Sequence, residues 1–144
     1  MEKTTKFLNQ QVANWNIMFV KLHNYHWYVK GEQFFVLHEK FEALYDLAAE
    51  QIDVLAERIL ALKGRPAGTL KEYLEITNIK EATGKEDDKE MVKTIAQDFS
   101  NMAEELKKGI EIAQSEDDES TADMFIETVT ELEKQIWMLT SFLG

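Results

Sequence analysis

The scarcity of turn-forming residues is the feature that most constrains this chain. Only one proline and six glycines occur in 144 residues, so the backbone has few points at which it can reverse. The elements between these points must be long, and helices are the natural candidates. The sequence therefore predicts an all-α fold.

Apolar side chains recur at intervals of three and four residues, as on the buried face of a helix. Four stretches carry this pattern, at residues 8–29, 37–62, 92–113 and 122–143. Gly31 follows the first stretch, and Gly64 and then Pro66 follow the second, as is common beyond a helix C-terminus. We therefore expect four amphipathic helices, the first ending at Gly31 and the second at Gly64.

The lengths of the connections predict how these helices are arranged. Few residues separate the first helix from the second and the third from the fourth, so each pair should be antiparallel. Residues 64–85 form a longer connection, which at about 3.3 Å per residue could span roughly 70 Å, more than the roughly 40 Å of a long helix. Within it, Thr69 and Glu72 match a capping box that predicts a short helix. We expect a single domain over residues 1–144, a four-helix bundle of ferritin-like topology with one long crossover.

The composition favours a folded, acidic protein that attracts cations. The chain has 27 acidic and 16 basic side chains, a formal charge of −11 at pH 7, and 44% hydrophobic residues. That much apolar material can form a core, which argues against a disordered chain. The negative field attracts metal ions and repels phosphate backbones, so a general nucleic-acid binder is not expected.

The absence of cysteine limits the chemistry further. It excludes disulfides, thiolate metal sites and a cysteine nucleophile, and it fits a reducing compartment. No signal peptide and no apolar run of membrane-spanning length is apparent. We expect a cytoplasmic protein with no membrane partner, in which histidine and carboxylate side chains hold any metal.

Potential metal ligands lie on one face of the second helix. The residues of this face are His38, Glu42, Tyr45, Ala49, Asp53 and Glu57. In the first helix, His26 occupies a position of the apolar stripe where a leucine would be expected. A core histidine with a hydrogen-bond partner explains His26 taken alone, and a solvated acidic face explains any one carboxylate. Together, imidazole and carboxylate groups form a ligand set for iron, zinc or manganese.

Distance along the helix decides how such a site could close. A short hairpin could bring His26 near His38. Asp53 lies 15 residues beyond His38, about 22 Å farther along the axis at about 1.5 Å per residue. One chain therefore cannot place His38 and the Asp53/Glu57 pair on one metal, but two chains with these helices antiparallel about a two-fold axis could. The spacing suggests a metal site shared between subunits.

The residues around these positions resemble those of a known family. The segments that carry the resemblance are His26-Trp27, Gly31, Phe34-Phe35, Leu37-His38-Glu39, Asp53 and Ala56-Glu57-Arg58. They are similar to the signature of the Dps mini-ferritins, and the likeness covers nearly the whole chain. It implies a ferroxidase that oxidises Fe(II) to Fe(III), preferably with hydrogen peroxide. It also implies a hollow homododecamer that stores the ferric mineral and protects against oxidative damage.

The resemblance also implies roles for individual residues at an inter-subunit ferroxidase centre. His26 and His38 would come from one subunit, and Asp53 and Glu57 from its partner. Trp27 would lie close to the iron, although simple packing explains this residue equally well. Glu42 stands where many family members have aspartate, and its longer side chain can shift the second, weaker iron position. His23, three residues before His26, is expected at the surface or behind the ligands.

An acidic cluster lies at the start of the fourth helix. Within it, Asp118, Asp123 and Glu127 resemble the carboxylate-lined three-fold pores through which iron enters shells of this family. Helix capping and a favourable helix dipole explain the first acids of the cluster equally well.

Two rival functions remain open. The chain could be a metal-free four-helix structural or signalling module in which His26 only fills the core. It could also be a DNA-compacting member of the family, although such members generally use a lysine-rich tail and only Lys3 and Lys6 precede the first helical pattern here. We therefore expect DNA binding to be unlikely.

Overall fold

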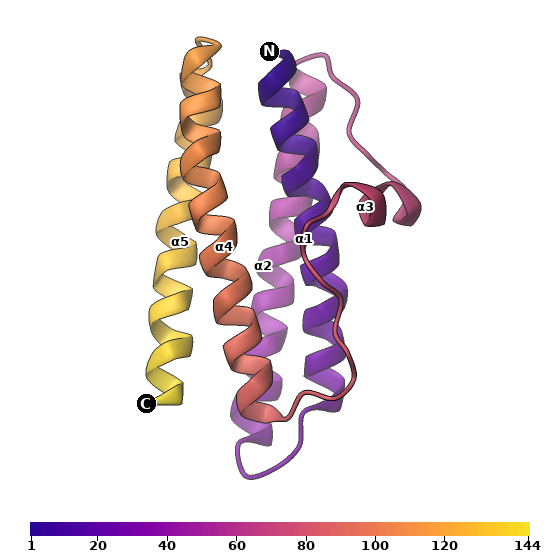
Figure 1. The fold of residues 1–144 in the computed structure, drawn as a ribbon, viewed down its shortest axis with the longest axis vertical. Helices are drawn as coiled ribbons and strands as arrows, with labels where there is room; N and C mark the ends of the chain where they lie inside the picture. The colour runs from indigo at the N-terminus through magenta and orange to yellow at the C-terminus, as the bar shows by residue number, and fades with distance from the viewer. The chain divides into compact units, whose positions relative to one another are not determined.

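The computed structural model describes residues 1–144 and contains five helices and no strand (Figure 1). The helices are α1 (Glu2–Tyr28), α2 (Phe34–Ala61), α3 (Leu70–Ile76), α4 (Asp88–Ser115) and α5 (Glu119–Leu143). The four predicted long helices and the short one are confirmed. None of the five combines the length and the apolarity that a membrane-spanning helix needs.

The helices begin earlier than the apolar pattern indicates. The first starts at Glu2 and the second at Phe34, several residues before the first apolar position of each stripe. Periodicity marks only buried positions, and the first residues of both helices are largely exposed, being polar in α1 and apolar in α2. The crossover between Ala61 and Asp88 is slightly longer than the predicted 64–85, because α2 ends three residues before Gly64 and α4 begins at Asp88.

Residues of the chain group into two compact units, each described by itself. One unit comprises Thr5–Asp88, and the other comprises Met1–Thr4 with Lys89–Gly144. In the first unit, α1 and α2 run antiparallel, as predicted, and are joined by a short turn (Figure 1). Their apolar stripes are buried at Leu8, Val12, Trp15, Leu22, Leu37, Phe41, Leu44 and Ile59. The expectation of a single domain stays a prediction.

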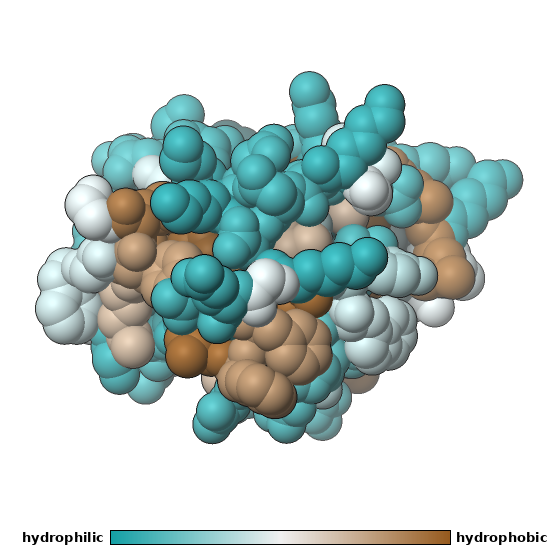
Figure 2. Space-filling view, turned by 90° about the horizontal axis from the view of Figure 1, so that it is seen from below, coloured by the Kyte–Doolittle hydropathy of each residue, from teal (hydrophilic) through white to brown (hydrophobic).

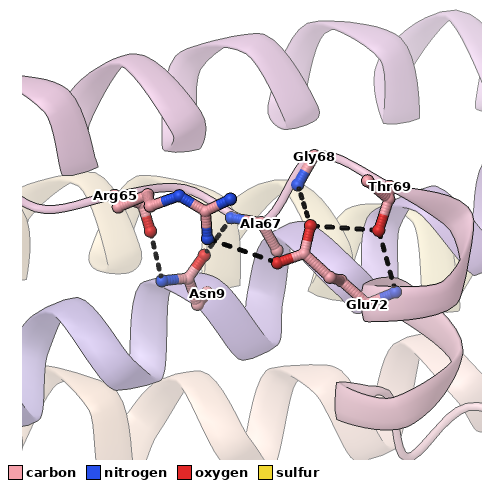
Figure 3. A network of polar contacts seen from close by, with 6 residues as sticks. All are labelled: Asn9, Arg65, Ala67, Gly68, Thr69 and Glu72. Carbon is pink, nitrogen blue, oxygen red and sulfur yellow. Dashed lines mark hydrogen bonds and ion pairs between the residues drawn. The ribbon is translucent and has the colours of Figure 1, made fainter.

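Polar side chains of α1 hold the crossover in place. The Asn9 amide donates to the Arg65 carbonyl (3.1 Å) and accepts from the Ala67 N–H (2.8 Å) (Figure 3). Farther along, Asn14 Oδ1 accepts from the Thr77 hydroxyl at 2.7 Å. Because α1 has fixed side-chain spacing, these contacts fix the path of a segment that has little regular structure of its own.

The capping box that predicts α3 is confirmed. Thr69 Oγ1 accepts from the Glu72 N–H at 3.1 Å, and Glu72 Oε1 accepts from the Gly68 N–H at 3.1 Å (Figure 3). Burial of apolar residues contributes little, since Leu70 and Leu74 on this helix are exposed. The cap and the contacts to α1 therefore decide where the short helix lies.

The second unit is built on α4 and α5, which also run antiparallel (Figure 1). Asp118 caps α5 by accepting hydrogen bonds from the N–H (3.0 Å) and the hydroxyl of Thr121. Glu116, in the turn between the helices, accepts from the N–H of Thr4 at 2.7 Å and lies 3.3 Å from the Met1 ammonium. The hydrogen bonds from Thr4 lower the pKa of the Glu116 carboxyl to about 2. The beginning of α1 is thus held by a charged acceptor.

Gly64 has a different role from the helix stop that the sequence suggests. The residue with positive φ after α2 is Lys63, at 67°. At Gly64, a Cβ atom would lie 2.7 Å from Thr5 Cγ2 and 3.0 Å from Ile59 Cγ2. Glycine is therefore needed here for close packing of the crossover against α1.

Replacing Gly64 by alanine should lower the free energy of unfolding by about 1–3 kcal/mol, because Thr5 or the backbone must shift to admit the methyl group. The matched control is Gly68→Ala, where an added Cβ meets nothing within 4 Å and a change within about 0.5 kcal/mol is expected. Urea unfolding at a fixed protein concentration measures both. Equal effects of the two substitutions would contradict the close-packing role.

Candidate metal centre

Two imidazole rings meet where the end of α1 passes the beginning of α2. His26 and His38 stack with ring centroids 3.7 Å apart and an interplanar angle of 12°. His26 is only 6% exposed, whereas His38 is half-buried. Both belong to the unit of residues 5–88, and the predicted hairpin contact between them is confirmed.

Reciprocal hydrogen bonds orient the two rings. His26 Nδ1 lies 2.6 Å from the His38 carbonyl oxygen, and His38 Nδ1 lies 2.7 Å from the His26 carbonyl oxygen. A carbonyl can only accept, so Nδ1 of each ring carries the proton. In the neutral ring with its proton on Nδ1, Nε2 has the lone pair with which histidine binds a metal.

The end of α1 explains why the hydrogen bond from the His38 ring forms. His26 lies in the last turn of α1, whose carbonyl groups have no N–H partner within the helix. The His38 ring supplies that partner. Because each bond joins a side chain of one helix to the backbone of the other, the pair also fixes the register between α1 and α2.

A carboxylate lies near Nε2 of His26. Glu42 is one turn after His38 on α2, and its Oε1 is 3.9 Å from His26 Nε2. The Glu42 side chain is 53% exposed and can therefore turn toward a bound ion. Two neutral imidazole nitrogens and a carboxylate suit iron, zinc or manganese.

Asp53 and Glu57 do not join this group within the chain. Both are exposed on α2, and no group of three or more histidine, aspartate or glutamate side chains is arranged to hold a metal ion within one chain. The structure thus brings together His26, His38 and Glu42 and leaves the other two predicted ligands apart.

Aromatic rings pack against the imidazole pair, and we call Tyr45, His23 and Trp27 the aromatic cluster. Tyr45 is edge-on to His26, with ring centroids 5.3 Å apart, and His23 stacks on Tyr45 at 3.7 Å. His23 is half-buried, and its Nδ1 lies 2.8 Å from the Phe19 carbonyl oxygen. Burial, followed by the charges of Glu42 and Asp46, raises the pKa of Tyr45. The sequence placed Tyr45 on the same face of α2 as the predicted ligands but did not predict its ring contacts with His23 and His26. The position of Tyr45 two turns beyond His38 was the only signal for them.

Trp27 is the most exposed member of the aromatic cluster. Its ring centroid is 5.2 Å from that of His23, and the side chain is 65% exposed. Phe35 and Val36 on α2 are exposed as well. Viewed from the end of the molecule where α1 turns into α2, apolar side chains interrupt the hydrophilic surface (Figure 2). Exposed apolar side chains of this kind are typical of surfaces that contact another protein.

The predicted pore residues differ in their surroundings. Asp118 is 4% exposed, and its carboxylate is occupied by the cap of α5. Asp123 and Glu127 are exposed one helical turn apart on α5. Helix capping by Asp118 is confirmed, while the pore itself stays a prediction.

Comparisons with known proteins identify the family. The ferritin-like domain family matches residues 5–144. DNA protection during starvation protein 2 of Bacillus anthracis is 56% identical over 99% of this chain and 98% of its own length. The crystal structure of a Dps protein from Bacillus brevis has a TM-score of 0.98 and 50% identity over 99% of this chain and 96% of that chain. The chain belongs to the Dps family of mini-ferritins.

A second solved structure supports the same assignment. Dps from Staphylococcus aureus has a TM-score of 0.98 and 49% identity, covering all of this chain and 97% of that chain. The predicted fold class, a ferritin-like four-helix bundle with a short helix in the crossover, is confirmed, as is the resemblance to the Dps family.

In this mini-ferritin the imidazole pair should act as one structural unit. His26→Ala and His38→Ala should each lower the free energy of unfolding by about 1–2 kcal/mol through the lost hydrogen bond. Either substitution also removes the ring stacking, so the double variant should cost about 0.5–1.5 kcal/mol less than the sum of the singles. Urea unfolding of the metal-free proteins measures the three values. Strict additivity would contradict the coupling.

Proposed function

We propose that this chain is an iron-storing ferroxidase whose reaction site is completed by a second copy of the chain. The observation that carries the proposal is the pair of stacked imidazoles, each bonded through Nδ1, with the Glu42 carboxylate 3.9 Å from His26 Nε2. Fe(II) is the substrate, hydrogen peroxide is the oxidant, and Fe(III) is the stored product. Storage would occur inside a hollow shell of twelve subunits.

The donor set supports iron as the substrate. Neutral imidazole nitrogens and carboxylate oxygens bind Fe(II), and carboxylates also stabilise the higher charge of Fe(III). Zinc and manganese accept similar ligands, but zinc cannot give up an electron under these conditions. The kinship with ferritin-like proteins favours iron among the remaining candidates.

The missing ligands support a shared site. Asp53 lies about 22 Å along α2 from His38, and Glu57 about 28 Å, at about 1.5 Å per residue. If two copies pack with α2 antiparallel about a two-fold axis, the Asp53/Glu57 end of one copy meets the His38/Glu42 end of the other. The exposed Trp27 and Phe35 at this end would then be covered by the second copy.

The oxidation balances with two ferrous ions for each peroxide. Each Fe(II) gives one electron, the O–O bond breaks, and two protons complete two water molecules. Hydrolysis of the ferric ions then releases protons as the mineral forms. Because both electrons reach the same peroxide molecule, no hydroxyl radical need be released. Removal of Fe(II) and peroxide together would protect a cell from oxidative damage.

Direct binding to DNA is not part of the proposal, although relatives carry the name DNA protection during starvation protein. The chain has a formal charge of −11, which opposes contact with phosphates. The first residues, including Lys3, are held by Glu116. Protection through iron and peroxide chemistry requires no such contact. We place this activity in the cytoplasm, in keeping with a chain that has no cysteine.

Iron would reach the interior through acidic openings. Asp123 and Glu127 are exposed on one face of α5, and three copies around a three-fold axis would focus a negative field that attracts Fe(II). In this proposal Asp118 lies at the rim and acts mainly through its cap of α5.

Mixed shells test the shared site directly. His26→Ala and Asp53→Ala subunits should each be nearly inactive in peroxide-driven Fe(II) oxidation after separate assembly. When the two are unfolded, mixed equally and reassembled, half of the two-fold dimers contain one of each, and each such dimer regains one of its two sites. The mixture should therefore recover about one quarter of the wild-type rate.

The control is the same pair of variants mixed after assembly, which should recover nothing. Recovery of no activity in the reassembled mixture, with shells that form normally, would show that one chain holds all the ligands and would overturn the shared site. A wild-type protein that oxidises no Fe(II) would instead support the metal-free structural module.

A further inference from the structure

The last turn of α1 is tied to the end of the crossover by a buried tyrosine. Tyr25, immediately before His26, is fully buried, and its hydroxyl donates to Glu86 Oε2 at 2.6 Å. The contact lies wholly within residues 5–88.

Glu86 is a strong and well-fixed acceptor. Its carboxylate also accepts from the N–H of Thr83 (3.1 Å), the hydroxyl of Thr83 (2.7 Å) and the N–H of Lys85 (3.1 Å). Burial raises the pKa of the Glu86 carboxyl, but the hydrogen bonds from Tyr25 and Thr83 outweigh it and lower that pKa to about 2. The group is therefore ionised at neutral pH, and its bond with Tyr25 is charge-assisted.

The Tyr25 ring also reaches α2. Its centroid is 6.0 Å from that of Phe41, which is fully buried one turn beyond His38. Tyr25 and Phe41 are thus close in sequence to the two imidazoles, and their packing sets how the last turn of α1 lies against the first turns of α2. The imidazole pair depends on that register, because its two hydrogen bonds join side chains to backbone carbonyls across the helices.

From this geometry we propose that Tyr25 and Glu86 are a positioning pair for the metal centre, holding His26 so that its Nε2 stays directed at a bound ion. The inference rests on the proposed function. Neither residue touches the metal, and both act through the register of α1 on α2. Residues that orient metal ligands in this way commonly change affinity by about 10–100-fold when they are lost.

The probe is Co(II), which binds histidine and carboxylate groups and does not turn over as Fe(II) does. Titration of the assembled protein should show Co(II) binding that His26→Ala abolishes. Tyr25→Phe keeps the ring against Phe41 and removes only the hydroxyl, and it should weaken Co(II) binding about tenfold. Glu86→Ala should weaken it by a similar factor. The double variant should be no weaker than the stronger single, because both substitutions break one interaction.

The control is Thr77→Val, which removes a hydroxyl that donates to Asn14 of α1 and accepts from the Ile79 N–H, far from the imidazoles. It should lower the unfolding temperature about as much as Tyr25→Phe while leaving Co(II) affinity unchanged. Equal affinity in Tyr25→Phe and Thr77→Val would overturn the positioning role. Absence of Co(II) binding in the wild type, or binding that His26→Ala leaves intact, would instead overturn the proposed site.

Discussion

The reciprocal hydrogen bonds between His26 and His38 are the interaction on which the candidate site depends. Each ring donates from Nδ1 to the carbonyl of the other residue, so one contact satisfies an open carbonyl at the end of α1, fixes the tautomer of both rings and sets the helix register. A leucine at position 26 would pack as well but would do none of these. The same two hydrogen bonds therefore orient the rings for metal binding and stabilise the hairpin of α1 and α2.

The rest of the unit of residues 5–88 can be understood as support for that contact. The crossover has few buried apolar residues, yet it follows one path because polar groups on α1, from Asn9 through Asn14 to Tyr25, bind it at intervals. Each bond is worth only about 0.5–1.5 kcal/mol. Because all of these bonds involve side chains of one rigid helix, they act together. The bond of Tyr25 lies next to His26.

Much of the fold and the chemistry of the site could be predicted from the sequence. The apolar spacing identified the four long helices, the Thr69/Glu72 pattern identified α3, and the spacing of His26 and His38 around Gly31 predicted their meeting. The stacking of His23 on Tyr45, the close approach at Gly64 and the Tyr25–Glu86 bond could not be predicted. They depend on side-chain directions and long-range contacts, which periodicity does not describe.

The charge distribution is consistent with a protein that handles cations, but the geometry of the ligands carries the stronger argument. The central claim is that two copies of the chain contribute to one iron site, and a crystal structure of the assembled protein loaded with Fe(II) without oxygen tests it most directly. We predict iron bound to Nε2 of His26 and His38 from one chain and to Asp53 and Glu57 of a second. Iron held by residues of a single chain, or a site without either histidine, would contradict it.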